Sequence, residues 1–146
     1  MKELIDLLVE KKRLEDKYGH ISCFDAPEAY ERMEELADKA RERAEQLAKE
    51  CRCSTSAIME VAEDIADDIL DGNIRDDVNV SLFNVDDFIE EYVLSGVDEA
   101  GRKLFDSLYY WMDADMRIQW LKRNYIDGDH SIYTAQNVDC IAVIGE

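Results

Sequence analysis

Acidic side chains are the residues of this sequence whose types and spacing could do chemistry. Glu60, Asp64, Asp67, Asp68 and Asp71 follow one another at i, i+4, i+7, i+8 and i+11. On a helix this spacing lines the carboxylates along one side in steps of roughly 6 Å, comparable to the spacing of phosphates along a nucleic-acid strand. The pattern predicts a row of negative charge that fits a basic groove.

The negative charge of the chain is concentrated in one segment. The formal net charge is −18 over 146 residues, and residues 54–100 hold 14 acids against the single base Arg75, which is −13 of the total. Residues 1–53 (−3) and residues 101–146 (−2) are nearly balanced. Such a charge disfavours nucleic acid and anionic lipid as ligands and speeds encounter with basic partners. We therefore expect a cationic partner.

Solubility is the alternative explanation for the acidic helix face. A protein that uses negative charge only for solubility is expected to be acidic throughout, and the balanced flanks argue against it. We therefore interpret the acidic segment as a contact surface. Its candidate partner-binding residues are Glu60, Asp64, Asp67, Asp68, Asp71, Asp76, Asp77, Asp86, Asp87, Glu90 and Glu91.

In size, composition and charge, the chain resembles the acidic DNA-mimic inhibitors of phages and mobile elements, which include antirestriction and anti-CRISPR proteins. The resemblance covers chiefly residues 54–100, and no functional residue is carried over from it. It implies an inhibitor that occupies the basic, nucleic-acid-binding groove of a partner enzyme, such as a CRISPR or restriction enzyme. The alternative is a non-enzymatic adaptor or regulator that binds through an apolar helix groove, with the acidic face merely solvated.

Catalytic and metal-binding patterns are weak in this sequence. His20 and Cys23, together with Cys51 and Cys53, supply four candidate zinc ligands, but C-x-C at a helix end suits tetrahedral geometry poorly. Free cysteines explain the same residues, and we favour them. The two histidines stand in no triad context, and no phosphate-binding glycine loop is present. We therefore expect no enzymatic activity and no cofactor.

Residues 47–61 resemble the two-helix unit of helix-turn-helix regulators. The small Ala48 and the apolar Ile58 and Val61 stand at matching places, but Arg52 occupies the turn position that usually holds Gly. The second helix of the unit also carries Glu60, where a DNA-facing residue is neutral or basic. We favour an ordinary helix corner and expect no direct contact with nucleic acid.

The elements that must position these residues form one helix-dominated α+β domain over residues 1–146. Asp25 and Pro27 indicate a helix start, Ser54 or Thr55 caps the third helix, and Asn84 or Asp86 caps the fourth. Periodicity predicts helices over 2–18, from Pro27 through Cys51, from the Ser54 or Thr55 cap to the stop at 71–73, through 87–89 to about Leu94, over 98–112 and over 114–125. It also predicts a strand over 78–83, a turn at 127–129, and a hairpin of 131–135 with 138–144. The aromatic residues of 98–125 are expected in the core.

The remaining expectations concern compartment and assembly. No apolar run approaches the ~18 residues of a membrane span, so we expect no membrane contact. Four irregularly spaced cysteines read as reduced thiols, which predicts a cytoplasmic protein, in a bacterial host cell if the gene is phage-borne. A homodimer through the long second helix is left open.

Overall fold

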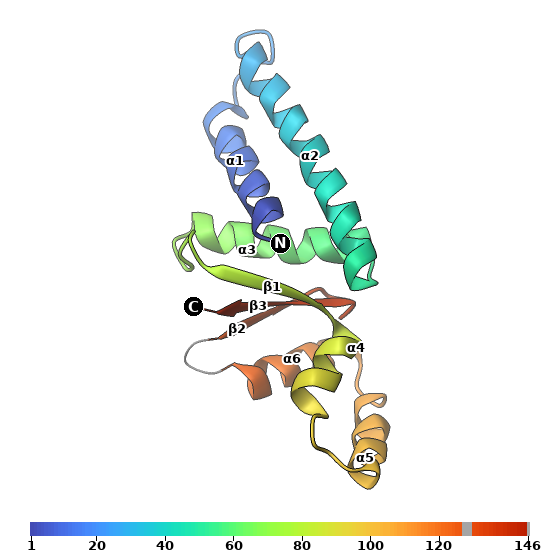
Figure 1. Ribbon diagram of the computed structural model, residues 1–146. Helices are drawn as coiled ribbons and strands as arrows, with labels where there is room; N and C mark the ends of the chain where they lie inside the picture. The colour runs from blue at the N-terminus through green and yellow to red at the C-terminus, as the bar shows by residue number, and fades with distance from the viewer. Residues whose placement is uncertain (127–129, 146) are drawn as a thin grey trace.

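A helical hairpin, a single crossing helix, a three-stranded sheet and a second group of helices lie one below another (Figure 1). The computed structural model describes residues 1–126 and 130–145. Over these ranges the elements are α1 (Lys2–Tyr18), α2 (Pro27–Cys51), α3 (Thr55–Leu70), β1 (Asn79–Asn84), α4 (Val85–Phe88), the π-helix η1 (Ile89–Val93), α5 (Glu99–Tyr109), α6 (Ala114–Tyr125), β2 (Ser131–Thr134) and β3 (Cys140–Gly145). The predicted helix-dominated α+β fold is confirmed.

The first three helices enclose one apolar core with the upper face of the sheet. α2 packs through the small buried residues Ala40, Ala44 and Ala48, which let its neighbours approach closely. Ser54 caps the start of α3, and its hydroxyl accepts a hydrogen bond from the Ala57 backbone N–H at 3.1 Å. α3 then buries one apolar stripe from Ala57 to Ile69, as its period predicts.

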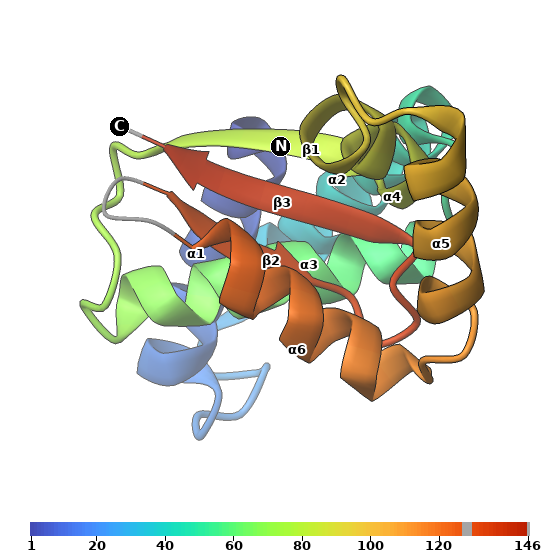
Figure 2. The same cartoon turned by 90° about the horizontal axis from the view of Figure 1, so that it is seen from below.

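The sheet separates this core from a second one. Its order is β1-β3-β2 with both pairs antiparallel, so the C-terminal strand β3 lies in the middle (Figure 2). Cys140, Ala142 and Ile144 of β3 belong to the core on the side of α3, whereas Ile141 and Val143 belong to the core on the side of α4 to α6. Burial on both faces explains why β3 is continuously apolar.

The helices below the sheet differ in detail from the expectation. Asn84 caps α4 by accepting from the Asp86 backbone N–H at 3.1 Å, but the chain widens into a π-helical turn at Ile89 instead of continuing as one α-helix. α5 ends at Tyr109, three residues before the predicted end. Beyond it Tyr110 and Trp111 are 75% and 89% exposed. The prediction that this aromatic run lies in the core is therefore wrong at these two residues.

Two smaller corrections concern helix and turn ends. Asp25 was expected to cap α2 with its side chain, but the cap is Ala26, which makes no side-chain capping bond. The expectation is therefore wrong for Asp25, although Pro27 does open the helix. The predicted turn at 127–129 lies outside the described residues. Over the described ranges, no helix combines the length and apolarity needed to cross a membrane.

Candidate functional site

The acidic row of α3 lies along the seam between α3 and the β2–β3 hairpin. Glu60 Oε1 accepts a hydrogen bond from the Gln136 backbone N–H at 3.0 Å. One turn beyond Asp64, Asp68 Oδ2 accepts a hydrogen bond from the Tyr133 hydroxyl at 2.6 Å. These two carboxylates hold the hairpin against α3, so part of the predicted row serves the fold.

The other members of the row are more open to solvent. Asp67 forms an ion pair with Lys12 of α1, and Asp71 is exposed at the end of α3. Burial raises the pKa of Asp64, and repulsion from its acidic neighbours Glu60, Asp67 and Asp68 adds to the rise, whereas Lys122 of α6 opposes it. Ionisation of Asp64 is therefore opposed first by partial burial and then by the negative charges around it.

The remaining predicted contact residues fall into two groups at opposite ends of β1. Asp76 and Asp77 lie in the connection from α3 to β1. Asp86 and Asp87 lie in α4, and Glu90 and Glu91 in η1. Because six strand residues span about 20 Å, the acidic segment makes two surfaces and not one row.

Basic residues from the balanced flanks neutralise some of these carboxylates. Arg52 pairs with Asp87, and Arg102 Nη1 lies 3.0 Å from Glu90 Oε2. Of the 14 acids in residues 54–100, five form an ion pair with a described residue. The nine without such a pair in the described part of the chain are Glu60, Glu63, Asp64, Asp68, Asp71, Asp76, Asp86, Glu91 and Asp98.

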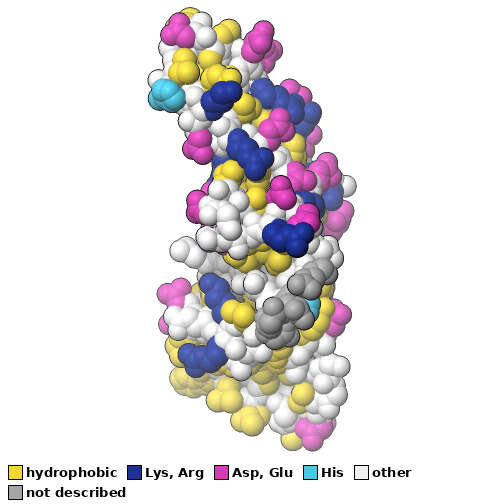
Figure 3. All heavy atoms as spheres, turned by 90° about the vertical axis from the view of Figure 1, so that its left-hand side faces the viewer, with side chains coloured by type: hydrophobic (Ala, Val, Ile, Leu, Met, Phe, Trp, Pro, Cys, Tyr) yellow, Lys and Arg dark blue, Asp and Glu magenta, His cyan; other side chains and the backbone are white. Residues whose placement is uncertain are grey.

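The surface also differs from one end of the molecule to the other. On the face shown in Figure 3, acidic and basic side chains intermix over the helical hairpin, whereas hydrophobic side chains gather at the lower end, below the sheet. Leu104 and Leu108 of α5 are 61% and 56% exposed, and Trp111, just beyond the end of α5, is 89% exposed. Apolar side chains of α5 and of the turn after it are thus left uncovered.

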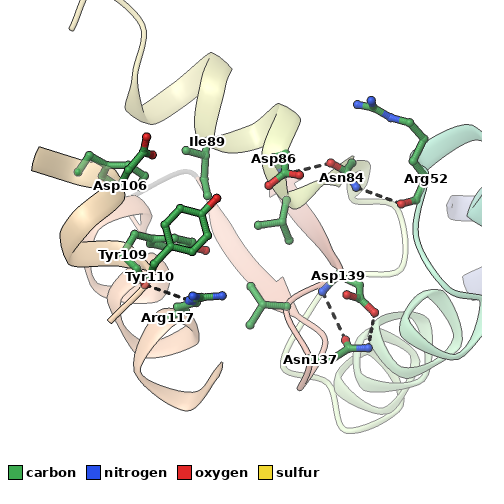
Figure 4. A pocket seen from close by; sticks show the side chains of 13 residues that line it. Arg52, Asn84, Asp86, Ile89, Asp106, Tyr109, Tyr110, Arg117, Asn137 and Asp139 are labelled. Atoms are coloured by element: carbon green, nitrogen blue, oxygen red, sulfur yellow. Dashed lines mark hydrogen bonds between the residues drawn. The ribbon is translucent and has the colours of Figure 1, made fainter. Parts of the chain in front are cut away.

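A cavity of about 330 Å³ opens between α4, α5, α6 and the turn before β3 (Figure 4). Asp86 contributes to it from α4, Asp106 from α5 and Asp139 from the turn, so three carboxylates line one small space. Arg117 of α6 also lines it, and so does Arg52, whose guanidinium points away from the hollow toward Asp87 (Figure 4). Of these five residues, the sequence singled out only Asp86 as a contact residue.

Tyr109 places an unpartnered hydroxyl at this cavity. The residue is only 7% exposed, and its buried hydroxyl has no hydrogen-bond partner within residues 1–126 and 130–145. The rings of Tyr109 and Tyr110 point into the hollow (Figure 4). Burial raises the pKa of Tyr109, Arg117 opposes the rise, and Asp86 adds to it. A buried polar group without a partner is costly, which makes this hydroxyl unusual.

Arg117 is held against the same tyrosines. Its Nε donates a hydrogen bond to the Tyr109 carbonyl oxygen at 3.1 Å. Its Cζ lies 4.7 Å from the ring centre of Tyr109 and 5.7 Å from that of Tyr110. The two rings therefore present faces that accept a guanidinium.

Unusual backbone also converges on the cavity. Arg52 (φ 56°) and Val138 (φ 59°) are the non-glycine residues with positive φ in the described part of the chain, and both line it. A β-branched residue in this region is a genuine outlier. Ile89, another lining residue, opens the π-helical turn η1. Strained backbone and π-helical turns cluster at functional sites.

The candidate zinc ligands are divided between the two ends of α2. His20 and Cys23 precede the helix, Cys51 ends it and Cys53 follows it, and 25 helical residues span about 37 Å. The two pairs therefore cannot share an ion. The described residues hold no cluster of three or more His, Cys, Asp or Glu suited to a metal, and all four thiols are free.

The helix corner formed by α2 and α3 is not arranged to enter a DNA groove. α3 lies between the α1–α2 hairpin and the sheet, and it buries its apolar stripe on both of them. Arg52 does adopt the left-handed conformation that glycine usually supplies at such a turn. The resemblance to a helix-turn-helix unit is therefore limited to the corner itself.

The sequence reasoning did not bring together Asp106 and Tyr109 of α5, Arg117 of α6 and Asp139, because no spacing signal connects α5, α6 and the turn before β3. Comparison with family models, with curated proteins and with solved structures finds no significant match to this chain.

Proposed function

We propose that the protein binds a basic protein partner through its acidic surface and inhibits that partner by occupying its nucleic-acid-binding groove. The observation that carries the proposal is the uncompensated charge of residues 54–100. Nine of their 14 carboxylates form no ion pair with any residue that the structure describes. The field of so many carboxylates steers a basic partner and repels nucleic acid itself.

The inhibition is steric and electrostatic and needs no catalytic step. Asp64 and Asp71 represent the acidic row of α3, and Asp86 and Glu91 represent the surface on α4 and η1. The carboxylates at the two ends of β1, about 20 Å apart, can replace phosphates at two places along a groove. Because these charges are exposed, binding should be fast and should weaken as salt increases.

Capture from a bacterial lysate, followed by a gel-shift assay, tests this function. The test variant carries Glu63→Gln, Asp64→Asn, Asp71→Asn and Glu91→Gln, none of which breaks an ion pair within residues 1–126 and 130–145. The control carries Glu31→Gln, Glu34→Gln, Glu42→Gln and Glu45→Gln on the outer face of α2, with the same change of net charge.

We expect the native protein and the control to capture a basic nucleic-acid-binding protein that is released by high salt and by duplex DNA. The test variant should capture much less of it. In the gel shift, the native protein should displace DNA from the captured partner. Equal capture by the test variant and the control, or a captured partner that still binds its DNA, would contradict the proposal.

A second candidate function is favoured by the uncovered apolar residues of α5 and of the turn after it. An adaptor that binds through Leu104, Leu108 and Trp111 would keep its partner in high salt, since apolar contacts do not depend on screening. Replacing these three residues by Ser would then abolish capture, whereas the charge variant would not. The two candidates therefore give opposite results in the same assay.

A further inference from the structure

We propose that the cavity below the sheet binds a guanidinium group, supplied by an arginine side chain of the basic partner. This inference rests on the proposed function for the source of the group, but the site itself is argued from its own residues. Its volume of about 330 Å³ lies at the small end of ligand pockets, which suits one side chain better than a folded segment.

The charge of the cavity favours a cation. Its lining holds Asp86, Asp106 and Asp139 against Arg52 and Arg117. Arg52 is already paired with Asp87, which lies outside the lining. Arg117 is thus the one remaining base against three carboxylates within the lining, so a further positive group is attracted.

The Tyr109 hydroxyl can accept a hydrogen bond from a ligand in the cavity. Its oxygen is buried, lacks a partner among the described residues and belongs to a ring that points into the hollow (Figure 4). A guanidinium carries five N–H donors in a planar fork, so it can donate to the phenol oxygen and to carboxylates at the same time. A bound guanidinium therefore satisfies the group that is otherwise orphaned.

The aromatic lining favours guanidinium over ammonium through Tyr110. Arg117 lies over both tyrosine rings, and Phe105 stacks on Tyr109 with 5.1 Å between ring centres, so a second planar cation can stack only on the exposed ring of Tyr110. Guanidinium stacks on aromatic faces and is more weakly hydrated than ammonium, so it enters a partly buried site at lower cost. Lysine should accordingly bind less well than arginine.

Titration of the intact protein with small probes, followed by NMR, tests the site directly. The probes are N-acetyl-arginine amide, its lysine counterpart and its citrulline counterpart, a neutral molecule of nearly the same shape. We expect saturable shifts with the arginine probe at Tyr109, Tyr110 and Ile89, weaker binding of the lysine probe and none of the citrulline probe. Citrulline binding equal to arginine binding, or shifts that never saturate, would overturn the inference.

Variants separate a ligand contact from a structural role. Asp86→Asn with Asp106→Asn should weaken arginine binding more than tenfold, whereas Glu31→Gln with Glu34→Gln, an equal change of charge on α2, should leave it unchanged. Tyr109→Phe should weaken it about tenfold without lowering the melting temperature, because the lost hydroxyl has no partner in the described residues. Unchanged affinity in Tyr109→Phe would overturn the inference.

A last arm identifies the source of the guanidinium and keeps the two proposals apart. Butylguanidinium carries the same group and the same single charge without a peptide backbone, and binding of the capped arginine at least as tight as that of butylguanidinium supports a side chain of a partner. Clearly tighter binding of butylguanidinium overturns the partner as the source. If the protein captures its partner from the lysate but does not bind the arginine probe, only the proposed guanidinium site is rejected. If it binds the probe but captures no basic partner, only the proposed inhibitor function is rejected.

Discussion

The Tyr133 hydroxyl donates a hydrogen bond to Asp68 Oδ2 at 2.6 Å and thereby joins β2 to α3. Burial raises the pKa of Tyr133, and the hydrogen bond to Asp68 adds to the rise, so the phenol stays protonated as a donor. Asp68, which the sequence placed in the row of contact residues, thus also connects α3 to β2. A partner that binds the Asp68 carboxylate has to compete with the Tyr133 hydroxyl.

Tyr133→Phe tests the structural role of this bond. Removing a hydrogen bond to a charged acceptor should lower the free energy of unfolding by about 1–2 kcal/mol, measured by urea denaturation at neutral pH. Tyr92→Phe, which removes a hydroxyl from a half-exposed ring of η1, is the control and should have little effect. Equal free energies of unfolding for the two variants would show that the Tyr133 hydrogen bond does not stabilise the fold.

Asp64→Asn should stabilise the protein at neutral pH. The folded-state pKa of Asp64 is raised above its ordinary value of 3.8, first by burial and then by Glu60, Asp67 and Asp68. The ionised carboxylate is therefore less favourable in the folded chain than in the unfolded one, and its penalty is present above the folded pKa. The penalty disappears as the pH falls through the folded pKa toward 3.8.

Thermal melts across a pH series measure this effect. The melting temperature of Asp64→Asn should exceed that of the native protein at pH 7, and the two should converge at acidic pH. Glu63→Gln removes the same charge from the neighbouring position on the same helix and serves as the control. A gain in Glu63→Gln as large as that in Asp64→Asn would attribute the effect to net charge and not to the position of Asp64.

Arg52→Gly and Arg52→Ala separate the backbone of the α2–α3 corner from its ion pair. Both substitutions remove the exposed pair with Asp87, but only glycine relieves the left-handed conformation at φ 56°. We expect Arg52→Gly to melt about 3 °C above Arg52→Ala. Equal melting temperatures would show that Arg52 adopts this conformation without strain.

Most of the helices, and the caps at Ser54 and Asn84, were predictable because their signals are local. Ser54, Asn84 and Pro27 mark helix starts in the sequence, and the apolar stripe of α3 repeats with the helical period. Which basic residues pair with the carboxylates of residues 54–100 was not predictable in this way. Lys12, Arg52 and Arg102 reach the acidic segment only through tertiary contacts, at separations of 12 to 55 residues.

The site was less predictable than the fold. Asp86 was recognised by its charge, but Tyr109 was taken as an ordinary core aromatic, because its sequence period does not show that its hydroxyl lacks a partner. The contrast between Tyr109 and its exposed neighbour Tyr110 is likewise set by where α5 ends. Helix ends depend on packing that a periodic pattern does not specify.

Trp111→Ala and Leu121→Ala together test whether the Trp111 side chain is exposed to solvent. Trp111 is 89% exposed, so its truncation should change the free energy of unfolding by no more than about 0.5 kcal/mol. Leu121 of α6 is 0% exposed in the second core, and its truncation leaves a cavity that should cost about 2–5 kcal/mol. Urea denaturation measures both. A large loss in Trp111→Ala would mean that its ring is covered in solution, either by the chain itself or by a second copy, and analytical ultracentrifugation distinguishes these two cases.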